Sequence, residues 1–134
     1  MNKLIIRDGI NKNGFLTVTL FKILQILEES GSATKWQICG VHEYGDQFEV
    51  VGEVAKEFEK LRNRKTLLEI EKLKSLSKKE HQLIWAEFRG FKEMSGVPAF
   101  IIRAVDSSWF DVATDDKMIM EKLVLAFEDT TTVA

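Results

Sequence analysis

The sequence contains only one cysteine and one proline among its 134 residues, and it has no long hydrophobic run. The single cysteine, Cys39, excludes a framework of internal disulfide bonds and is compatible with a reducing compartment. No apolar stretch approaches the length of about 18 residues that a membrane-spanning helix needs. Charged residues also occur within residues 3–8, too early for the apolar core of a signal peptide. We therefore expect a cytoplasmic protein that does not enter the membrane.

The composition is that of a soluble globular protein. Hydrophobic residues make up 45% of the chain and charged residues 30%, without the glutamine, serine or proline bias that is typical of disorder. A chain of this length fits one domain with its own hydrophobic core. Residues 129–134 lack any periodic pattern, so we expect a frayed tail at the end of a single folded domain.

The clearest structural pattern lies after the single proline, Pro98. Two apolar runs, 99–105 and 109–113, predict strands, and an Asp-Ser-Ser sequence between them supplies the turn. A helix is then expected, with Asp115 as its cap and with apolar residues at every fourth position up to Phe127. This segment therefore predicts a β-hairpin followed by an amphipathic helix.

Weaker patterns before Pro98 predict alternating strands and helices. The expected elements are a strand at 3–7, a helix at 16–27, a strand at 36–41, and two helices or one broken helix over 54–61 and 67–76. The alternation of apolar and polar residues over 16–20 leaves a strand open for the first residues of the first helix.

The segment 77–91 fits two structures. Ser77 and Glu80 match a capping box, which would start a helix at Lys78. The aromatic residues of 84–88, followed by Gly90, favour a strand instead. With the strand preferred, the expected fold is a single α+β domain: a mixed, mostly antiparallel sheet of about five strands with helices packed on it.

The net charge of −2 conceals an uneven distribution. The segment 56–79 holds nine basic and four acidic residues, a local charge of +5, so the remainder carries −7. Arg62, Arg64 and Lys65 form the expected basic surface of this segment. Because glutamates alternate with the basic residues at helical spacing, a solvated helix face is the favoured interpretation, and nucleic-acid binding is the alternative.

The chain offers few residues for a metal or a nucleophile. His42-Glu43 begins a zincin-like motif, but Asp46 stands where a second histidine is needed. Cys39 and His42 have the spacing of zinc ligands, yet only His81 remains and there is no second cysteine to complete a structural site. On a strand, an offset of three also places Cys39 and His42 on opposite faces. We therefore expect no thiol nucleophile, no bound metal and no cofactor.

Asp46 and Glu87 are the candidate catalytic residues. Glu87-Phe88-Arg89 on an expected strand, with Asp46 upstream, is loosely similar to the Asp and Glu-x-Lys arrangement of metal-dependent nucleases. The arginine in place of lysine stays protonated and cannot act as a base. A metal-dependent hydrolase or nuclease is therefore an alternative to the leading hypothesis.

Four acidic residues near the C-terminus have local structural roles. Asp106 suits the turn, Asp111 the solvent side of a strand, Asp115 the helix cap and Asp116 the first helical turn. Alternation places Trp109 on the same strand face as Asp111, opposite the face that the helix covers. Because tryptophan is enriched at the energetic centres of interfaces, we expect Trp109, Asp111 and Asp106 to bind a partner.

The residues from Val105 to Leu123 resemble the end of a family of small uncharacterised proteins from Bacillus and related bacteria. In that family an Asp-Ser turn, an aromatic and apolar strand with an aspartate, and a Glu-Lys-Leu helix occur in the same order. The resemblance covers about a fifth of the chain. It implies a bacterial protein with helices and strands, and it implies no catalytic residues.

Together these observations favour a non-enzymatic bacterial protein-interaction module. One concrete form is an immunity or antitoxin-like inhibitor, whose acidic C-terminal hairpin and helix would cover a basic surface of a toxin. A homodimer formed through an open sheet edge is a further expected arrangement. No small-molecule substrate is indicated.

Overall fold

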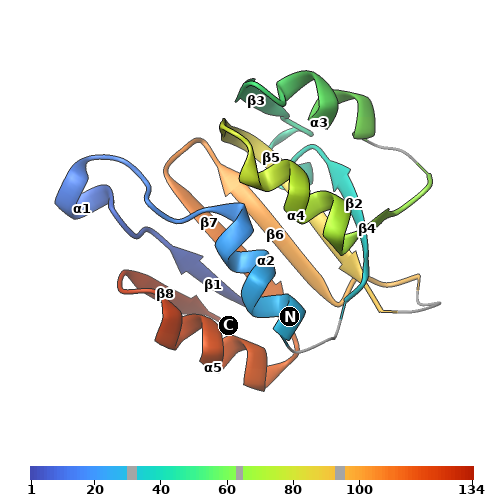
Figure 1. Cartoon of the computed structure of the whole chain (residues 1–134). Helices are drawn as coiled ribbons and strands as arrows, with labels where there is room; N and C mark the ends of the chain where they lie inside the picture. Colours follow the sequence, from blue (N-terminus) through green and yellow to red (C-terminus); the bar gives the residue numbers. More distant parts are fainter. Residues whose placement is uncertain (30–32, 63–64, 93–95) are drawn as a thin grey trace.

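An antiparallel sheet is the framework of this protein, and the described part of the chain contributes eight strands to it. The computed structural model describes residues 1–29, 33–62, 65–92 and 96–134. The strands are β1 (Asn2–Ile6), β2 (Lys35–Cys39), β3 (Glu49–Gly52), β4 (Leu68–Glu69), β5 (His81–Phe91), β6 (Phe100–Val105), β7 (Trp109–Thr114) and β8 (Thr130–Val133). They lie in the order β4-β2-β5-β6-β7-β1-β8, and β3 also pairs with β5 (Figure 1).

The α+β class is confirmed. The expected number of strands and the expected mixture of parallel and antiparallel pairs are wrong. Within the described residues the sheet has eight strands instead of about five, and every pair of named strands is antiparallel. Three strands that the sequence did not indicate, β3, β4 and β8, have only four, two and four residues. Strands of this length carry too few alternating positions to be distinguished from loops.

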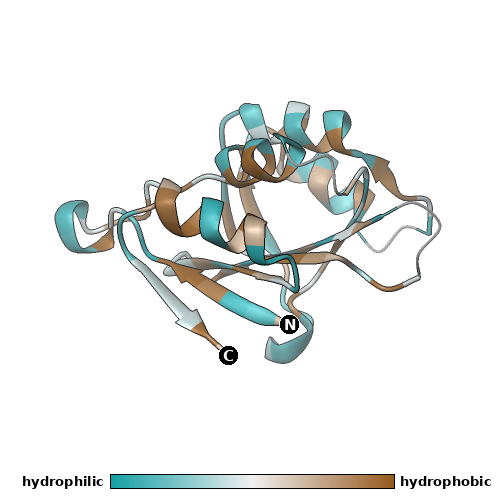
Figure 2. Ribbon diagram, turned by 90° about the horizontal axis from the view of Figure 1, so that it is seen from below, coloured by the Kyte–Doolittle hydropathy of each residue, from teal (hydrophilic) through white to brown (hydrophobic). Residues whose placement is uncertain are grey.

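The longer helices cover one face of the sheet. The helices are α1 (Ile10–Asn13), α2 (Leu20–Glu29), α3 (Ala55–Leu61), α4 (Ile70–Lys78) and α5 (Lys117–Ala126), with a 3₁₀ turn η1 (His42–Tyr44). In Figure 1, α2 lies between α4 and α5 in front of the central strands. Figure 2 shows these helices on one side of the sheet. We call the opposite side, which α2, α4 and α5 do not cover, the helix-free face. Side chains of η1 contact this face.

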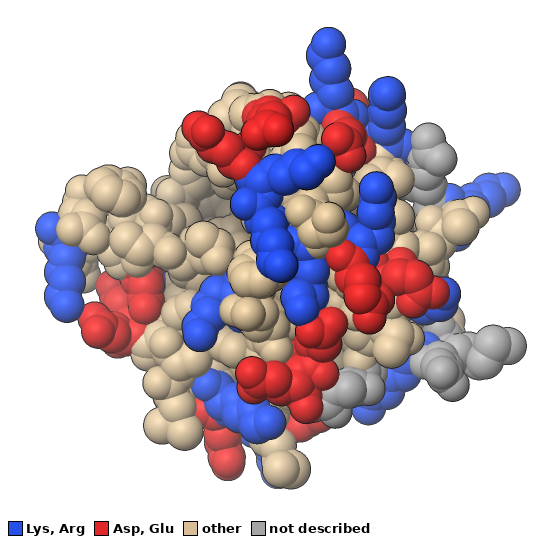
Figure 3. All heavy atoms as spheres, in the orientation of Figure 1, with Lys and Arg blue, Asp and Glu red and all other residues tan. Residues whose placement is uncertain are grey.

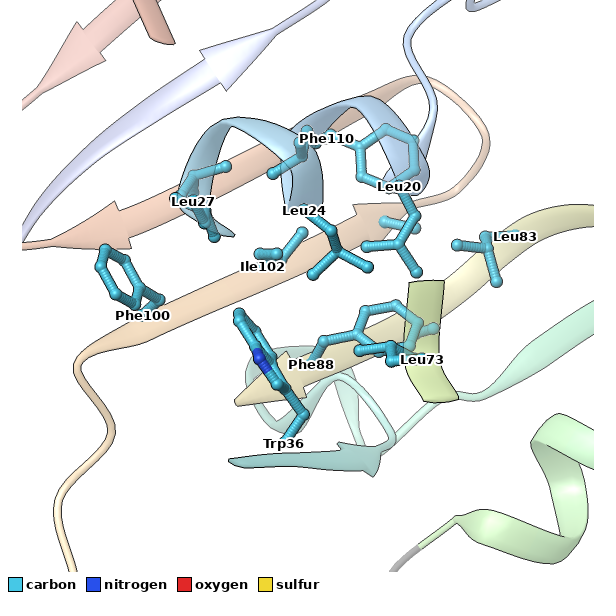
Figure 4. Close-up of a cluster of buried hydrophobic side chains, with 14 of the residues drawn as sticks. Leu20, Leu24, Leu27, Trp36, Leu73, Leu83, Phe88, Phe100, Ile102 and Phe110 are labelled. Carbon is cyan, nitrogen blue, oxygen red and sulfur yellow. The ribbon is translucent and has the colours of Figure 1, made fainter. Parts of the chain in front are cut away.

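The core lies between these helices and the sheet. Trp36, Phe88 and Ile102 point from their strands toward Leu24 of α2 and Leu73 of α4 (Figure 4), and all five side chains are fully buried. Burial of each such side chain contributes about 1.5–3 kcal/mol relative to its exposure. Because side chains alternate along each strand, the face of the sheet that packs against the helices is apolar, as expected for a sheet covered on one side.

Gly90 shows how closely this core is packed. A Cβ atom at Gly90 would lie 2.6 Å from the ring of Trp36, which is its direct cross-strand neighbour. The glycine therefore makes room for the indole. Within the part of the chain that the structure describes, Nε1 of Trp36 is a buried side-chain donor without a hydrogen-bond partner.

The C-terminal segment is not frayed, contrary to expectation. Residues Thr130–Val133 form β8 and pair with β1. The carboxylate of Asp8 accepts hydrogen bonds from the backbone N–H groups of Glu128 at 2.9 Å and Asp129 at 2.8 Å. These long-range contacts hold the start of β8, and no local sequence pattern reveals them.

Two helices begin later than expected, because different residues cap them. The side chain of Asp116, and not Asp115, accepts hydrogen bonds from the backbone N–H groups of Met118 and Ile119 at 3.0 and 3.1 Å. Thr19 Oγ1 accepts from the backbone N–H of Lys22 at 3.1 Å, so α2 starts at Leu20 and not at residue 16.

The choice of a strand for 84–88 is confirmed, and the alternative capping box is wrong. β5 runs over His81–Phe91, while Ser77 lies in the last turn of α4. Its hydroxyl donates backwards to the carbonyl of Lys74 at 2.8 Å. The expected hairpin is also confirmed, because Val105 of β6 lies opposite Trp109 of β7. The expected strand at 36–41 corresponds to β2.

Candidate functional site

Charged side chains form a row across the helix-free face of the sheet. The antiparallel register places Cys39, Glu87, Arg103 and Asp111 next to one another on β2, β5, β6 and β7. Their chain neighbours, such as Phe88 and Ile102, point into the core instead. Because side chains alternate along a strand, these four residues face away from the helices.

Arg103 connects three carboxylates. Its Nε donates to Oε1 of Glu87 at 2.9 Å, its Nη1 lies 3.3 Å from Oδ1 of Asp111, and its Nη2 lies 3.5 Å from Oε1 of Glu43. Arg89 Nε donates to the second oxygen of Glu87, Oε2, at 2.7 Å. We call Glu43, Glu87, Arg89, Arg103 and Asp111 the Arg103 network.

The centre of the Arg103 network is buried although α2, α4 and α5 lie on the other side of the sheet. Glu87 is 1% exposed and Asp111 3% exposed. Burial raises the pKa of the Asp111 carboxyl, and the neighbouring Arg103 offsets part of this effect. Burial alone would lower the pKa of Arg103, but Asp111 and Glu87 raise it. Asp111 faces away from the helices, as expected. The expectation that it lies on the solvent side is wrong, because its side chain is buried among its partners.

Three aromatic side chains border the Arg103 network. Trp109 Nε1 donates to Oδ2 of Asp111 at 3.3 Å, and the guanidinium carbon of Arg7 lies 5.2 Å from the centre of the indole ring. Trp85 stacks at a tilt against Tyr44, with 5.3 Å between ring centres. We call Tyr44, Trp85 and Trp109 the aromatic rim.

The aromatic rim lies at one end of the helix-free face. Trp85 and Trp109 both lie opposite Val105 in the sheet, on its two neighbouring strands, so their backbones are about 10 Å apart. Both are half-buried, while Tyr44 is 43% exposed. The prediction that Trp109 shares a face with Asp111, away from the covered core, agrees with the register and with the hydrogen bond between them.

Cys39 is buried, and its surroundings do not favour a thiolate. Burial is the main cause that raises its pKa from 9.0 to about 11, and its Sγ lies 3.6 Å from the backbone oxygen of Glu87. A nucleophile needs the opposite shift. His42 is exposed and lies 3.3 Å from Asp46, so its side chain is engaged with a carboxylate.

The two candidate catalytic acids have very different surroundings. Asp46 is exposed in a left-handed turn with φ of 57°, whereas both oxygens of Glu87 accept charge-assisted hydrogen bonds from arginines. Among residues 1–29, 33–62, 65–92 and 96–134, no group of three or more histidine, cysteine, aspartate or glutamate side chains is arranged to hold a metal ion.

The expected basic surface is paired with acids only in part. Arg62 Nη1 lies 3.3 Å from Glu59 and its guanidinium carbon 5.0 Å from the centre of the Phe48 ring. Lys65 is exposed, and Arg64 lies outside the described residues. Elsewhere on this surface Lys74 pairs with Glu28 at 2.5 Å. Figure 3 shows basic and acidic side chains interleaved over α4.

The other C-terminal acids do not form one patch. Asp106 and Asp115 flank opposite ends of β7. Asp106 is exposed in the hairpin turn next to the aromatic rim, with φ of 50°. Asp115 lies 3.6 Å from the N-terminal amine, and Asp116 caps α5.

Sequence reasoning missed Arg103, Arg89 and Glu43 as parts of the site. A signal for Arg103 was available, because an arginine within the apolar run Phe100–Val105 requires a buried carboxylate partner or a route to solvent. Asp111 lies within the equally apolar β7. Two residues of opposite charge in adjacent strands of one hairpin indicate a cross-strand ion pair.

No family model, curated protein or solved structure matches the chain. Within the described part of the chain, no helix has the length and apolar content needed to cross a membrane.

Proposed function

We propose that this chain is a non-enzymatic protein-interaction module that binds its partner through the helix-free face of the sheet. One observation carries the proposal: half-exposed Trp109 and Trp85 and exposed Tyr44 border a group of charges that are already paired with one another. Tryptophan, tyrosine and arginine dominate the binding energy of interfaces. Strands β5 and β7 hold the two tryptophans, so these two anchors lose little conformational entropy on binding.

An immunity or antitoxin-like inhibitor is the form of this function that the charges favour. Exposed carboxylates of Glu43, Asp46 and Asp106 lie near the aromatic rim. They suit a partner with basic residues around an apolar patch, and complementary charge speeds the encounter of two proteins. In this proposal Asp111 holds the indole of Trp109 by a hydrogen bond and does not itself contact the partner.

A tagged pull-down from bacterial lysate, followed by mass spectrometry and measurement of the affinity of the purified pair, tests the proposal. We expect Trp109→Ala to weaken a stoichiometric complex by about 2 kcal/mol or more, the value typical of a hot spot. Leu125→Ala is the matched control, because Leu125 is an apolar residue on α5, on the other side of the sheet, and is 87% exposed. Circular dichroism establishes that both variants are folded.

Equal affinity of the Trp109→Ala and Leu125→Ala variants would place the contact elsewhere. A monodisperse protein that captures nothing from its host would contradict an interaction module. The metal-dependent hydrolase alternative makes a different prediction, since Glu87→Gln would then abolish activity. Pairing of both Glu87 oxygens with arginines argues against that alternative.

A homodimer through strand β8 is the second candidate interaction. β8 has the sequence Thr-Thr-Thr-Val, lies at the end of the strand order and carries none of the charges that usually protect an open edge. Thr132→Lys should then convert a dimer to a monomer in analytical ultracentrifugation. A monomeric wild-type protein would exclude this arrangement and leave the proposed face unaffected.

A further inference from the structure

A groove of about 740 Å³ lies at the corner where α4 passes into β5. The irregular segment 14–19 forms its opposite wall. In Figure 3 the hollow lies beside the arm that carries α1, and basic side chains of α4 border it. Its volume is within the range of about 300–1,000 Å³ that small-molecule sites occupy.

The floor of the groove is apolar. Leu83 of β5 and Phe110 of β7 contribute to it, together with Val18 of the opposite wall and Leu20, the first residue of α2. These four side chains are almost completely buried. Phe110 alternates with Trp109 and Asp111 along β7, so the groove lies on the helix-covered side and is separate from the helix-free face.

Two lysines form a positive rim above this floor. Lys78 and Lys79 are exposed, and neither forms an ion pair with an acid within the described residues. Lys74, one turn earlier on α4, is paired with Glu28. Lys78 lines the groove, and its Nζ lies 5.1 Å from the centre of the ring of Phe21, which follows the lining residue Leu20 on α2.

We propose that this groove binds a small amphipathic carboxylate, with its apolar chain on the floor and its carboxylate at Lys78 and Lys79. Charge complementarity at the rim selects an anion, and the apolar floor selects a hydrocarbon or aromatic body. Glu80 is the one acidic residue among the described residues of the lining, and its charge disfavours a ligand with more than one negative charge. This groove is a second site, and ligand binding there is independent of the proposed protein partner.

Calorimetric titration of the intact protein with dodecanoate, below its micellar concentration, tests the proposal. Dodecyltrimethylammonium is the matched probe, because it has the same hydrocarbon chain and the opposite charge. We expect saturable binding of one dodecanoate and at least tenfold weaker binding of the cation, roughly the effect of 1.4 kcal/mol. In a ¹H–¹⁵N NMR titration, the shifted amides should cluster in segments 14–20 and 77–83.

Charge-reversed variants locate the carboxylate. Lys78→Glu combined with Lys79→Glu should weaken dodecanoate binding by about tenfold or more. Lys72→Glu combined with Lys122→Glu changes the net charge equally, involves exposed lysines outside the groove, and should leave the affinity unchanged. The proposal is overturned by absence of dodecanoate binding, by equal affinity for both probes, or by equal affinity of both double variants.

Discussion

Trp109 and Asp111 lie two residues apart on one face of β7, and the indole Nε1 donates a hydrogen bond of 3.3 Å to Oδ2 of Asp111. The other oxygen of Asp111 lies 3.3 Å from Nη1 of Arg103. The aromatic rim and the buried Arg103 network are therefore one connected structure. A change to the buried charges should alter the position of the side chain that we expect to contact a partner.

Replacement of Arg103 should strongly destabilise the fold. Arg103→Met leaves the carboxylates of Glu87 and Asp111 buried without their common cation. Removal of one partner from a buried ion pair costs about 3–5 kcal/mol. Urea denaturation followed by circular dichroism should show this loss in the free energy of unfolding.

An exposed ion pair provides the control for Arg103. Lys35 pairs with Glu69 on β2 and β4, and both side chains are well exposed to solvent. Lys35→Met should therefore cost at most about 1 kcal/mol. Similar losses for the two methionine variants would show that the Arg103 network contributes no more than a surface pair.

The sequence predicted the elements whose pattern is local and missed those that depend on distant contacts. The hairpin of β6 and β7 was predictable, because alternation, turn residues and length agree within 99–113. The strand β8 was not, because the contact that orders it comes from Asp8, about 120 positions away. The face of Trp109 followed from alternation, but the burial of Asp111 required the position of Arg103 on the neighbouring strand.

The thiol of Cys39 should make the free energy of unfolding depend on pH in the alkaline range. Its pKa is about 11 in the folded protein, against 9.0 for an ordinary thiol. Between these values the folded state keeps the proton and the unfolded state releases it, so stability falls as the pH rises from about 9 to 11. The loss attributable to Cys39 is at most about 1.4 kcal/mol for each pH unit.

Comparison with a Cys39→Ser variant isolates this effect, since serine does not titrate and all other groups are shared. The stability of the wild type relative to the variant should fall across that alkaline range in urea denaturation. A difference that is independent of pH would contradict a raised thiol pKa. Labelling by a thiol reagent at pH 8 should also be slow until the protein unfolds.

The carboxylate of Asp8 should control the order of strand β8. Asp8→Ala removes the acceptor of the Glu128 and Asp129 backbone N–H groups. Each lost hydrogen bond to a charged group costs about 1.5–3 kcal/mol, part of which water recovers at this partly exposed site. Hydrogen exchange should accelerate at residues 130–133 and much less in β5 and β6. Asn11→Ala is the control, because it removes only one exposed contact to the Asp129 side chain; equal acceleration in both variants would contradict the role of Asp8.

The close approach of Trp36 to Gly90 predicts that even a methyl group is too large at this position. In Gly90→Ala the new Cβ would lie 2.6 Å from a ring atom of a fully buried indole. The ring cannot move without disturbing the core, and such overpacking costs typically about 1–3 kcal/mol. Gly96→Ala is the matched control, because among the described residues no atom other than those of its chain neighbours lies within 4 Å of the added Cβ. Thermal unfolding should show a lower melting temperature for Gly90→Ala than for Gly96→Ala. Equal values would mean that the sheet adjusts to the methyl group, and the packing of Trp36 would then not explain why residue 90 is a glycine.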